Sequence, residues 1–169
     1  MLAAMRPIRE LTLILLALAG AMLLSQLPGY VAAYEQRLGG ALDEARRTLY
    51  GFMQDAGSNG LSFETYVDRL KSNPDASVAA TGSSIEALAA RVASLTAQQE
   101  ELAAAGKLER PLLLLQHHDP DLLRASWAAY QASPSLDLEF GAIGLLLGWL
   151  LNALLWALLG PRYAYSRMR

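Results

Sequence analysis

The stretch FGAIGLLLGWLLNALLWALLG, residues 140–160, decides the fold of this protein. It contains no charged residue and a single amide, Asn152, and it is flanked by Glu139 and Arg162. A helix needs roughly 20 mainly apolar residues to cross a hydrocarbon core about 30 Å thick. The stretch therefore predicts a transmembrane helix, which we assign to residues 138–160.

A second apolar stretch, LTLILLALAGAMLLSQL at residues 11–27, lies near the N-terminus. Weakly polar residues extend it, so we assign a transmembrane helix to residues 11–31. A cleaved signal peptide is the alternative, because Arg6 and Arg9 form a basic N-terminal region and Ala19-Gly20-Ala21 resembles a cleavage site. The apolar run continues past that site without a polar segment, which favours a retained span.

The charged residues are divided unequally between the spans and their flanks. Five of the 14 basic residues lie outside the segment between the spans: Arg6, Arg9, Arg162, Arg167 and Arg169. The other nine share that segment with 15 of the 16 acids, so its net charge is about −6. Because basic residues accumulate on the cytoplasmic side, we predict both termini in the cytoplasm. The acidic segment also argues against nucleic acid as a partner, since phosphate binding needs a basic face.

These assignments divide the chain into five segments. Residues 1–10 form a cytoplasmic N-terminus, residues 11–31 the first span and residues 32–137 a periplasmic helical domain. Residues 138–160 form the second span and residues 161–169 a cytoplasmic tail. The predicted layout is that of a multi-pass membrane protein with both termini on the cytoplasmic side; in a bacterial inner (cytoplasmic) membrane, the middle segment would be periplasmic.

An amphipathic helix is predicted directly after the first span. Apolar residues recur at three- and four-residue steps from Val31 to Phe52, and charged residues fill the other faces. Pro28 lacks an N–H and crowds the carbonyl of Leu24, so we expect a kink or a break there. Gly39-Gly40 is either a tolerated weak point of this helix or a place where a partner helix approaches closely.

A short helix follows, and then a loop. Ser62 is placed to cap the short helix, which is expected to end before Pro74. Residues 74–82 are expected to form a loop. Ser83 and Glu86 form a capping-box pair that predicts the start of the next helix.

That next helix has the clearest periodicity in the chain. Apolar positions over residues 85–102 predict packing against the amphipathic helix of residues 31–52. Gly106 is expected to end it, and Pro111 and Pro120 each suit a first helical turn. No strand pattern is present. The predicted fold class is all-α, with two transmembrane helices flanking an extracytoplasmic helical bundle whose long first helix continues from the first span.

Small residues predict a close contact on the spans. Gly144 and Gly148 lie one turn apart, and Ala17 and Ala21 offer a matching face on the first span. The spacing leaves open whether this face packs the two spans together, serves self-association or has no role. Asn152 is expected to hydrogen-bond to a neighbouring helix rather than to bind an ion.

The sequence contains no recognisable catalytic or cofactor-binding motif. Without cysteine there is no thiol nucleophile and no thiolate metal site. His117-His118-Asp119 is the one place that points to a metal, but adjacent histidines on a helix diverge by about 100° and further ligands are not recognisable by spacing. We therefore predict no catalytic, cofactor-binding or metal site.

Two blocks of the sequence carry a family resemblance. The first comprises Gln26-Leu27-Pro28-Gly29-Tyr30-Val31, Tyr34-Glu35-Gln36-Arg37-Leu38-Gly39-Gly40 and Leu42-Asp43-Glu44-Ala45; the second comprises Arg110-Pro111, His118-Asp119-Pro120-Asp121 and residues 141–149. In these motifs the chain resembles the bacterial two-pass membrane proteins of domain-of-unknown-function family 2937. The motif residues that we single out are Gln26, Pro28, Tyr34, Arg37, Leu38 and Gly39. The resemblance implies a protein of the bacterial inner membrane, and it implies no activity because the family has none assigned.

The function therefore stays between two main hypotheses. Long amphipathic helices and small-residue span faces favour a non-enzymatic accessory or scaffold subunit of an envelope complex. Its partners would be the lipid bilayer and a membrane or periplasmic protein, with self-association as a further option. The alternative is a periplasmic sensor or ligand-binding module that signals through a separate membrane partner, since residues 161–169 are too short for an output domain. A hydrolase that uses His117 and His118 is the weakest hypothesis.

Overall fold

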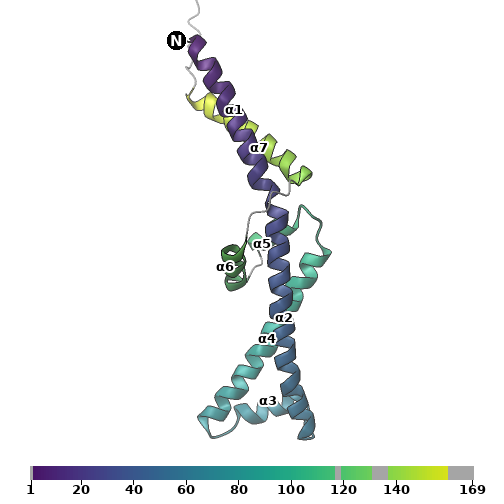
Figure 1. The fold of residues 1–169 in the computed structure, drawn as a ribbon. Helices are drawn as coiled ribbons and strands as arrows, with labels where there is room; N and C mark the ends of the chain where they lie inside the picture. Colours follow the sequence, from purple (N-terminus) through teal and green to yellow (C-terminus); the bar gives the residue numbers. More distant parts are fainter. Residues whose placement is uncertain (1, 117–118, 131–136, 160–169) are drawn as a thin grey trace, which may run out of the picture. The chain divides into compact units, whose positions relative to one another are not determined.

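The structure, a computed structural model, describes residues 2–116, 119–130 and 137–159. Within these ranges the chain forms seven α-helices and no β-strand, so the all-α prediction is confirmed (Figure 1). In chain order the helices are α1 (Leu2–Ser25), α2 (Leu27–Ser58), α3 (Phe63–Lys71), α4 (Ala76–Ala104), α5 (Arg110–Gln116), α6 (Pro120–Ala129) and α7 (Leu138–Leu159).

The chain divides into two compact units, which we describe separately. The terminal unit comprises residues 1–29 and 131–169, and the middle unit comprises residues 30–130. In the terminal unit α1 and α7 pack side by side. Asp137 caps α7, since its carboxylate accepts hydrogen bonds from the backbone N–H groups of Glu139 and Phe140, both at 3.2 Å.

Two helical stretches are long and apolar enough to cross a membrane, one beginning at Pro7 and the other at Leu138. Only 6% and 17% of the residues in their most apolar windows are buried. The core helix of a soluble protein has the opposite character, because its apolar residues are mostly buried. Both helices therefore have the length and the outward-facing apolar surface that a membrane span requires.

The helix breaks between α1 and α2 at Gln26, two residues before Pro28. The Gln26 N–H donates to the Leu23 carbonyl, three residues back, at 3.2 Å. This bond closes a turn tighter than that of an α-helix, in which the acceptor lies four residues back. Pro28 then lies in the first turn of α2, where a missing N–H costs nothing. The break expected from Pro28 is thus confirmed, and it lies upstream of the proline because the lost bond is the one back to Leu24.

The core of the middle unit joins α2, α4 and α5. Tyr34, Leu38 and Leu42 of α2 are at most 1% exposed, and they share one cluster with residues of α4 and α5. The full buried set of the cluster is Val31, Tyr34, Leu38, Leu42, Leu95, Leu102 and Leu114. α2 and α4 run in opposite directions and cross (Figure 1), so the predicted contact between the two amphipathic helices is observed.

The double glycine in α2 makes no close contact. A Cβ atom on Gly40 would meet nothing within 4 Å, and one on Gly39 would lie 3.9 Å from Gln99 Nε2, which is an ordinary contact. The tolerated weak point is therefore the interpretation that the structure supports.

The loop predicted at residues 74–82 is wrong. α4 begins at Ala76 and is capped by Asp75, whose carboxylate accepts from the backbone N–H of Ser77 at 2.8 Å. The Ser83–Glu86 capping box is wrong for the same reason, because Ser83 lies inside α4 and its hydroxyl donates to the Ala79 carbonyl at 3.2 Å.

A close approach between α3 and α4 favours this earlier helix start. A Cβ atom on Gly82 would lie 2.8 Å from the backbone nitrogen of Lys71, so the glycine allows α3 to pack directly on α4. Lys71 Nζ also donates to both carboxylate oxygens of Glu86, at 2.8 and 2.7 Å. Gly82 is the last residue of the segment expected to form a loop, and its contact with α3 could not be seen in the composition of that segment.

The remaining helix ends follow the predicted signals with one exception. The Ser62 hydroxyl accepts from the Thr65 N–H at 3.2 Å and caps α3, and Pro111 and Pro120 lie in the first turns of α5 and α6. The exception is the end of α4, where Ala105 terminates the helix in an extended conformation (φ −75°, ψ 144°). Gly106 follows it without the positive φ of a glycine cap.

Candidate functional site

Glycines bring the backbones of α1 and α7 into contact. A Cβ atom on Gly144 would overlap the carbonyl oxygen of Gly20 and lie 2.7 Å from the backbone nitrogen of Ala21. A Cβ atom on Gly148 would overlap a backbone carbonyl of α1 and lie 2.7 Å from the Cα atom of Ala17. Both positions therefore accept only glycine without a shift of the helices. The structure brings together all four small residues singled out in the sequence and adds Gly20.

The face formed by these residues is occupied within the chain. Contacts proceed four residues at a time in opposite directions along the two helices, from Gly20–Gly144 through Gly148 to Thr12–Asn152. Such a series is typical of an antiparallel helix pair with small residues at the contact.

A hydrogen-bonded cluster continues the α1–α7 contact. The Thr12 hydroxyl donates to Asn152 Oδ1 at 3.0 Å and also lies 2.9 Å from the Arg9 carbonyl, so one proton serves two acceptors. The same hydroxyl accepts from Trp156 Nε1 at 3.0 Å. Asn152 is 5% exposed, and it bonds to the neighbouring helix as expected. The cluster satisfies polar groups that would be costly to leave unpaired in an apolar surrounding.

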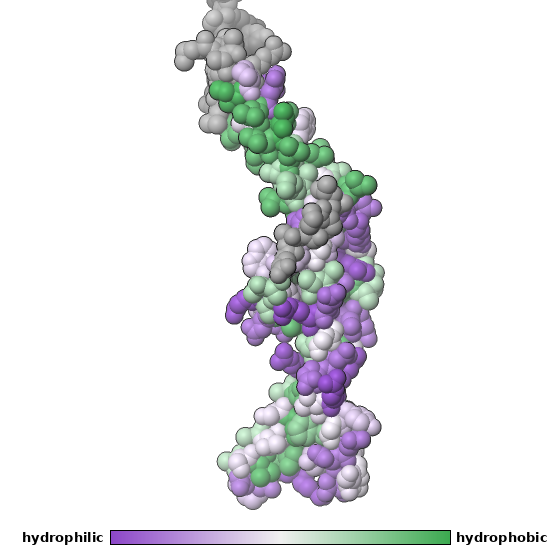
Figure 2. Space-filling model, in the orientation of Figure 1, coloured by the Kyte–Doolittle hydropathy of each residue, from purple (hydrophilic) through white to green (hydrophobic). Residues whose placement is uncertain are grey.

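The outer surface of the two helices is apolar. Figure 2 shows green, hydrophobic side chains over α1 and α7, whereas purple, hydrophilic side chains cover much of the middle unit. A shallow apolar groove also runs along the pair, lined by leucines of both helices together with Ala19, Gly20 and Gly148.

Tyr34 links three elements of the middle unit. Its side chain is fully buried, its hydroxyl donates to Gln98 Oε1 of α4 at 3.1 Å, and it accepts from the backbone N–H of Asp119 at 3.1 Å. Burial raises the pKa of Tyr34 above its ordinary value, and the bond from Asp119 opposes this rise. The neutral hydroxyl is therefore kept, and only the neutral form can donate to Gln98.

The Tyr34–Asp119 bond joins the two sequence blocks that carry the family resemblance. Asp119 in turn caps α6, its carboxylate accepting from the N–H groups of Asp121 and Leu122 at 2.9 and 3.1 Å. Leu38 is in the core at 1% exposure, whereas Arg37 is exposed on α2. Tyr34 and Leu38 thus stabilise the core of the middle unit, whereas the exposed position of Arg37 assigns it no role.

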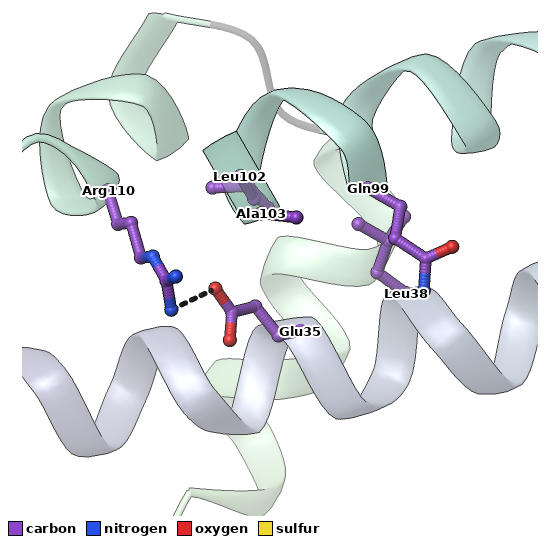
Figure 3. Close-up of a pocket in the computed structure, with 6 residues that line it drawn as sticks. All are labelled: Glu35, Leu38, Gln99, Leu102, Ala103 and Arg110. Carbon is purple, nitrogen blue, oxygen red and sulfur yellow. Dashed lines mark ion pairs between the residues drawn. The ribbon is translucent and has the colours of Figure 1, made fainter. Parts of the chain in front are cut away.

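A recess of about 290 Å³ lies where α2, α4 and α5 meet (Figure 3). Arg110 of α5 pairs with Glu35 of α2 at 3.2 Å, and its Nε also donates to the Ala105 carbonyl at 3.2 Å. Both charged side chains are about one third exposed, so the ion pair itself adds little stability. The other lining residues are Leu38, Gln99, Leu102 and Ala103. The volume is at the lower limit for a small-molecule pocket, and the charged pair offers both signs to a polar ligand.

No metal site forms among the described residues, in which no group of three or more His, Asp or Glu side chains converges. His117 and His118, the candidate metal ligands, lie outside the described residues. Arg162, Arg167 and Arg169, which carry the predicted orientation of the second span, also lie outside them.

Sequence reasoning missed several of these contacts. Nothing in the sequence marks Thr12 or Trp156 as special. Their hydrogen bonds, Thr12 to Asn152 and Trp156 to Thr12, follow from the alignment of α1 with α7. Gly20 could have been predicted, because it is a glycine in the first span and close backbone contact between two helices requires small residues on both of them. The Glu35–Arg110 pair had no signal in spacing.

The described residues thus define an all-helical protein with two helices long and apolar enough to cross a membrane. The family model described as "Protein of unknown function (DUF2937)" matches residues 8–167, nearly the whole chain. The chain therefore belongs to this family, as the motifs of the sequence indicated. No curated protein and no solved structure matches the chain.

Proposed function

We propose that this protein is a two-span protein of the bacterial inner membrane that acts without catalysis, as an accessory or scaffold subunit. The middle unit contacts a partner protein, and the α1–α7 pair holds it at the membrane. The observation that carries the proposal is the α1–α7 pair itself, which is closed on the inside by glycines and hydrogen bonds and apolar on the outside.

The outer surface of the pair supports a lipid environment. Its exposed large apolar residues include Leu11, Ile14, Leu15, Leu18, Met22 and Leu23 on α1 and Leu145, Leu146, Leu147, Leu150, Leu151 and Leu154 on α7. Monomeric soluble proteins rarely expose contiguous apolar patches larger than a few hundred Å². In lipid this surface needs no cover, and the paired Thr12 and Asn152 avoid the cost of unsatisfied polar groups.

The charges of the chain support the orientation with both termini in the cytoplasm. The middle unit holds 13 acids and nine basic residues, whereas five arginines lie at the two ends of the chain. Basic residues accumulate on the cytoplasmic side of a membrane protein, which places both ends of the chain there in this proposal.

The surface of α2 supports contact with a partner protein. Tyr50 and Met53 lie one turn apart on α2 and are 61% and 44% exposed, although both are large apolar residues. Aromatic residues and methionine are enriched in the buried centres of protein interfaces. A partner with an apolar patch and a basic rim would complement this pair on an acidic unit.

Site-specific crosslinking in native membranes tests the proposal. A photocrosslinking amino acid is introduced at Tyr50 or Met53, with Thr48 on the opposite, exposed face of α2 as the control position. We expect one crosslinked protein that mass spectrometry identifies from the first two positions and not from Thr48. Recovery of the unpartnered monomer alone from both test positions counts against an interaction role.

The recess at Glu35 and Arg110 favours a second candidate, a sensor or ligand-binding module. A ligand that binds only the folded protein raises its melting temperature. Small carboxylates and amines are screened against the full-length protein in detergent. A hit that is lost in Arg110→Gln and kept in Arg91→Gln, a change at an exposed position of α4, would favour sensing.

A further inference from the structure

An aromatic cluster surrounds Tyr30, near the start of α2. The Tyr30 ring meets the Trp127 ring edge to face, with centroids 5.6 Å apart, and the Tyr130 ring in the same manner at 5.7 Å. The Tyr30 hydroxyl donates to the Leu123 carbonyl at 3.1 Å. These contacts fix the position of α6 on α2 and hold the three rings in a defined arrangement.

A groove lies beside this cluster. It has a volume of about 400 Å³ and is lined by Tyr30, Pro120, Leu123, Arg124 and Trp127. Trp127 is 71% exposed although its ring is fixed on one side by Tyr30. The groove therefore has apolar walls, a large aromatic side chain open to the surroundings and a single cation.

The length of the connecting chain keeps the groove near the end of the first candidate span. α1 ends at Ser25, and Tyr30 follows five residues later within α2. Five helical residues rise about 7.5 Å. The interfacial layer on each side of the hydrocarbon core is roughly 5–8 Å thick. A tilt of α2 only brings Tyr30 closer to the membrane.

The chemistry of the groove fits this depth. Tryptophan and tyrosine accumulate at membrane interfaces, where the ring lies among apolar groups and its N–H or O–H reaches water and headgroups. The Arg124 side chain is 81% exposed and lies 3.8 Å from the Asp121 carboxylate, which is too long for a strong hydrogen bond. Its guanidinium can therefore bind a phosphate with two parallel hydrogen bonds.

From these observations we infer that the groove lined by Tyr30, Pro120, Leu123, Arg124 and Trp127 binds a phospholipid of the surrounding bilayer. The aromatic rings lie at headgroup level, and Arg124 binds the lipid phosphate. The site holds α6 at the membrane surface. The inference rests on the proposed function, because it requires that α1 and α7 span the membrane.

Fluorescence quenching by brominated phospholipids tests this site in the full-length protein reconstituted in bilayers. The chain has three tryptophans. Trp149→Phe with Trp156→Phe leaves Trp127 as the reporter of the groove. Trp127→Phe with Trp156→Phe leaves Trp149, which lies near the middle of α7 and reports whether this helix is in lipid. Because Trp156 bonds to Thr12, the difference between wild type and Trp127→Phe serves as a second measure of Trp127.

We expect Trp127 to lose about half of its emission in lipid brominated near the headgroup and less in lipid brominated near the bilayer centre. Trp149 should show the reverse order. If Trp127 is unquenched while Trp149 is quenched, the lipid site is wrong and the spans stand. A blue-shifted, unquenched Trp127 would place it against a protein and would also overturn the site. If neither is quenched, the proposed membrane function itself is wrong.

Arg124→Gln tests the phosphate contact in the variant that keeps only Trp127. Phosphatidylglycerol brominated near the headgroup is diluted into unlabelled phosphatidylcholine, whose choline offsets the charge of its phosphate, so Trp127 quenching reports how far the anionic lipid is preferred at the groove. We expect Arg124→Gln to lower this quenching about twofold, whereas the control Arg91→Gln leaves it unchanged. Equal quenching in both variants overturns the role of Arg124.

Discussion

At the level of single residues, the Tyr34 hydroxyl connects three elements of the middle unit. From α2 it donates to Gln98 of α4 and accepts from the backbone N–H of Asp119, the cap of α6. A buried donor or acceptor that loses its partner costs more than a new bond contributes. The hydroxyl is therefore a sensitive point of the middle unit.

Tyr34→Phe tests this. We expect a loss of about 1–3 kcal/mol in the free energy of unfolding, because the Asp119 N–H and the Gln98 amide are left without their partner. Urea unfolding of the full-length protein in detergent, followed by circular dichroism, measures the change. Tyr50→Phe is the control, since Tyr50 is 61% exposed, and it should cost less than about 0.5 kcal/mol. Equal losses in the two variants would contradict the role of Tyr34.

The raised pKa of Tyr34 makes this stabilisation depend on pH. The native state holds the phenol proton more tightly than the unfolded state, whose tyrosine pKa is about 10. The contribution is therefore complete below pH about 10 and is lost as the pH rises further through the native pKa. The difference in stability between wild type and Tyr34→Phe should stay constant from neutral pH to about pH 9 and shrink above pH about 10. A difference that grows at high pH would contradict the raised pKa.

In the terminal unit, Gly144 is the residue at which a small substitution is expected to have a large effect. In Gly144→Ala the new methyl group meets the carbonyl of Gly20, so α1 and α7 must move apart at a cost of about 1–3 kcal/mol. Gly141→Ala on the same helix is the matched control, because a Cβ atom there meets nothing within 4 Å. Titration with a denaturing detergent, followed by tryptophan fluorescence, compares them. If the two variants unfold together, the glycine contact is not what holds the pair.

At the level of elements, the start of α4 shows how a cap and a distant contact act together. Asp75 provides the cap, and Gly82 lets α3 lie on the first turns of the helix. The hydrogen bonds from Ser77 lower the pKa of Asp75, so the cap is ionised at neutral pH. Its contribution is present above the ordinary aspartate pKa of about 4 and is lost as the pH falls through the lower native value.

Asp75→Ala should therefore loosen the first turn of α4. We expect faster amide hydrogen exchange at Ser77 and its neighbours, because their N–H groups lose the capping carboxylate. Ser83→Ala is the comparison, since a capping box at Ser83 would predict the larger effect there. Slower exchange in the first turn, or a larger effect from Ser83→Ala, would restore the later helix start.

At the level of the whole molecule, the membrane orientation is the property on which the proposed function depends. Basic residues at both ends of the chain and acidic residues in between predict that the termini share one side. The turn between α2 and α3, where Gly60 has φ 68°, is the natural place for a reporter on the other side. Exposed turns of this kind tolerate insertions.

Paired reporters test the orientation. A green fluorescent protein fused after Arg169 should fluoresce, because it folds in the cytoplasm. Alkaline phosphatase inserted after Asn59 should be active, because it requires the periplasm. An active phosphatase after Arg169, or a mature chain that begins near Met22, would contradict the two-span layout.

Much of the architecture could be predicted from the sequence because its signals are local. An uncharged stretch of sufficient length predicts a span, and the steps between Val31 and Phe52 predict one buried face of α2. The error at residues 74–82 arose where local composition and a distant contact disagree. Pro74 and Gly82 are residues that favour a loop, but Gly82 also allows Lys71 to lie against α4.

The sequence by itself determined which stretches are helical and apolar, the excess of acidic residues in the middle and the family to which the chain belongs. Only the tertiary structure decided that Gly20 contacts Gly144. The same holds for the hydrogen bonds of Thr12 with Trp156 and Asn152 and for the bond between Tyr34 and Asp119. The physical reason is register. Helix formation depends on neighbours three and four residues away. These contacts depend on how two segments far apart in the chain are aligned, and side-chain spacing can indicate a matching face but does not fix that alignment.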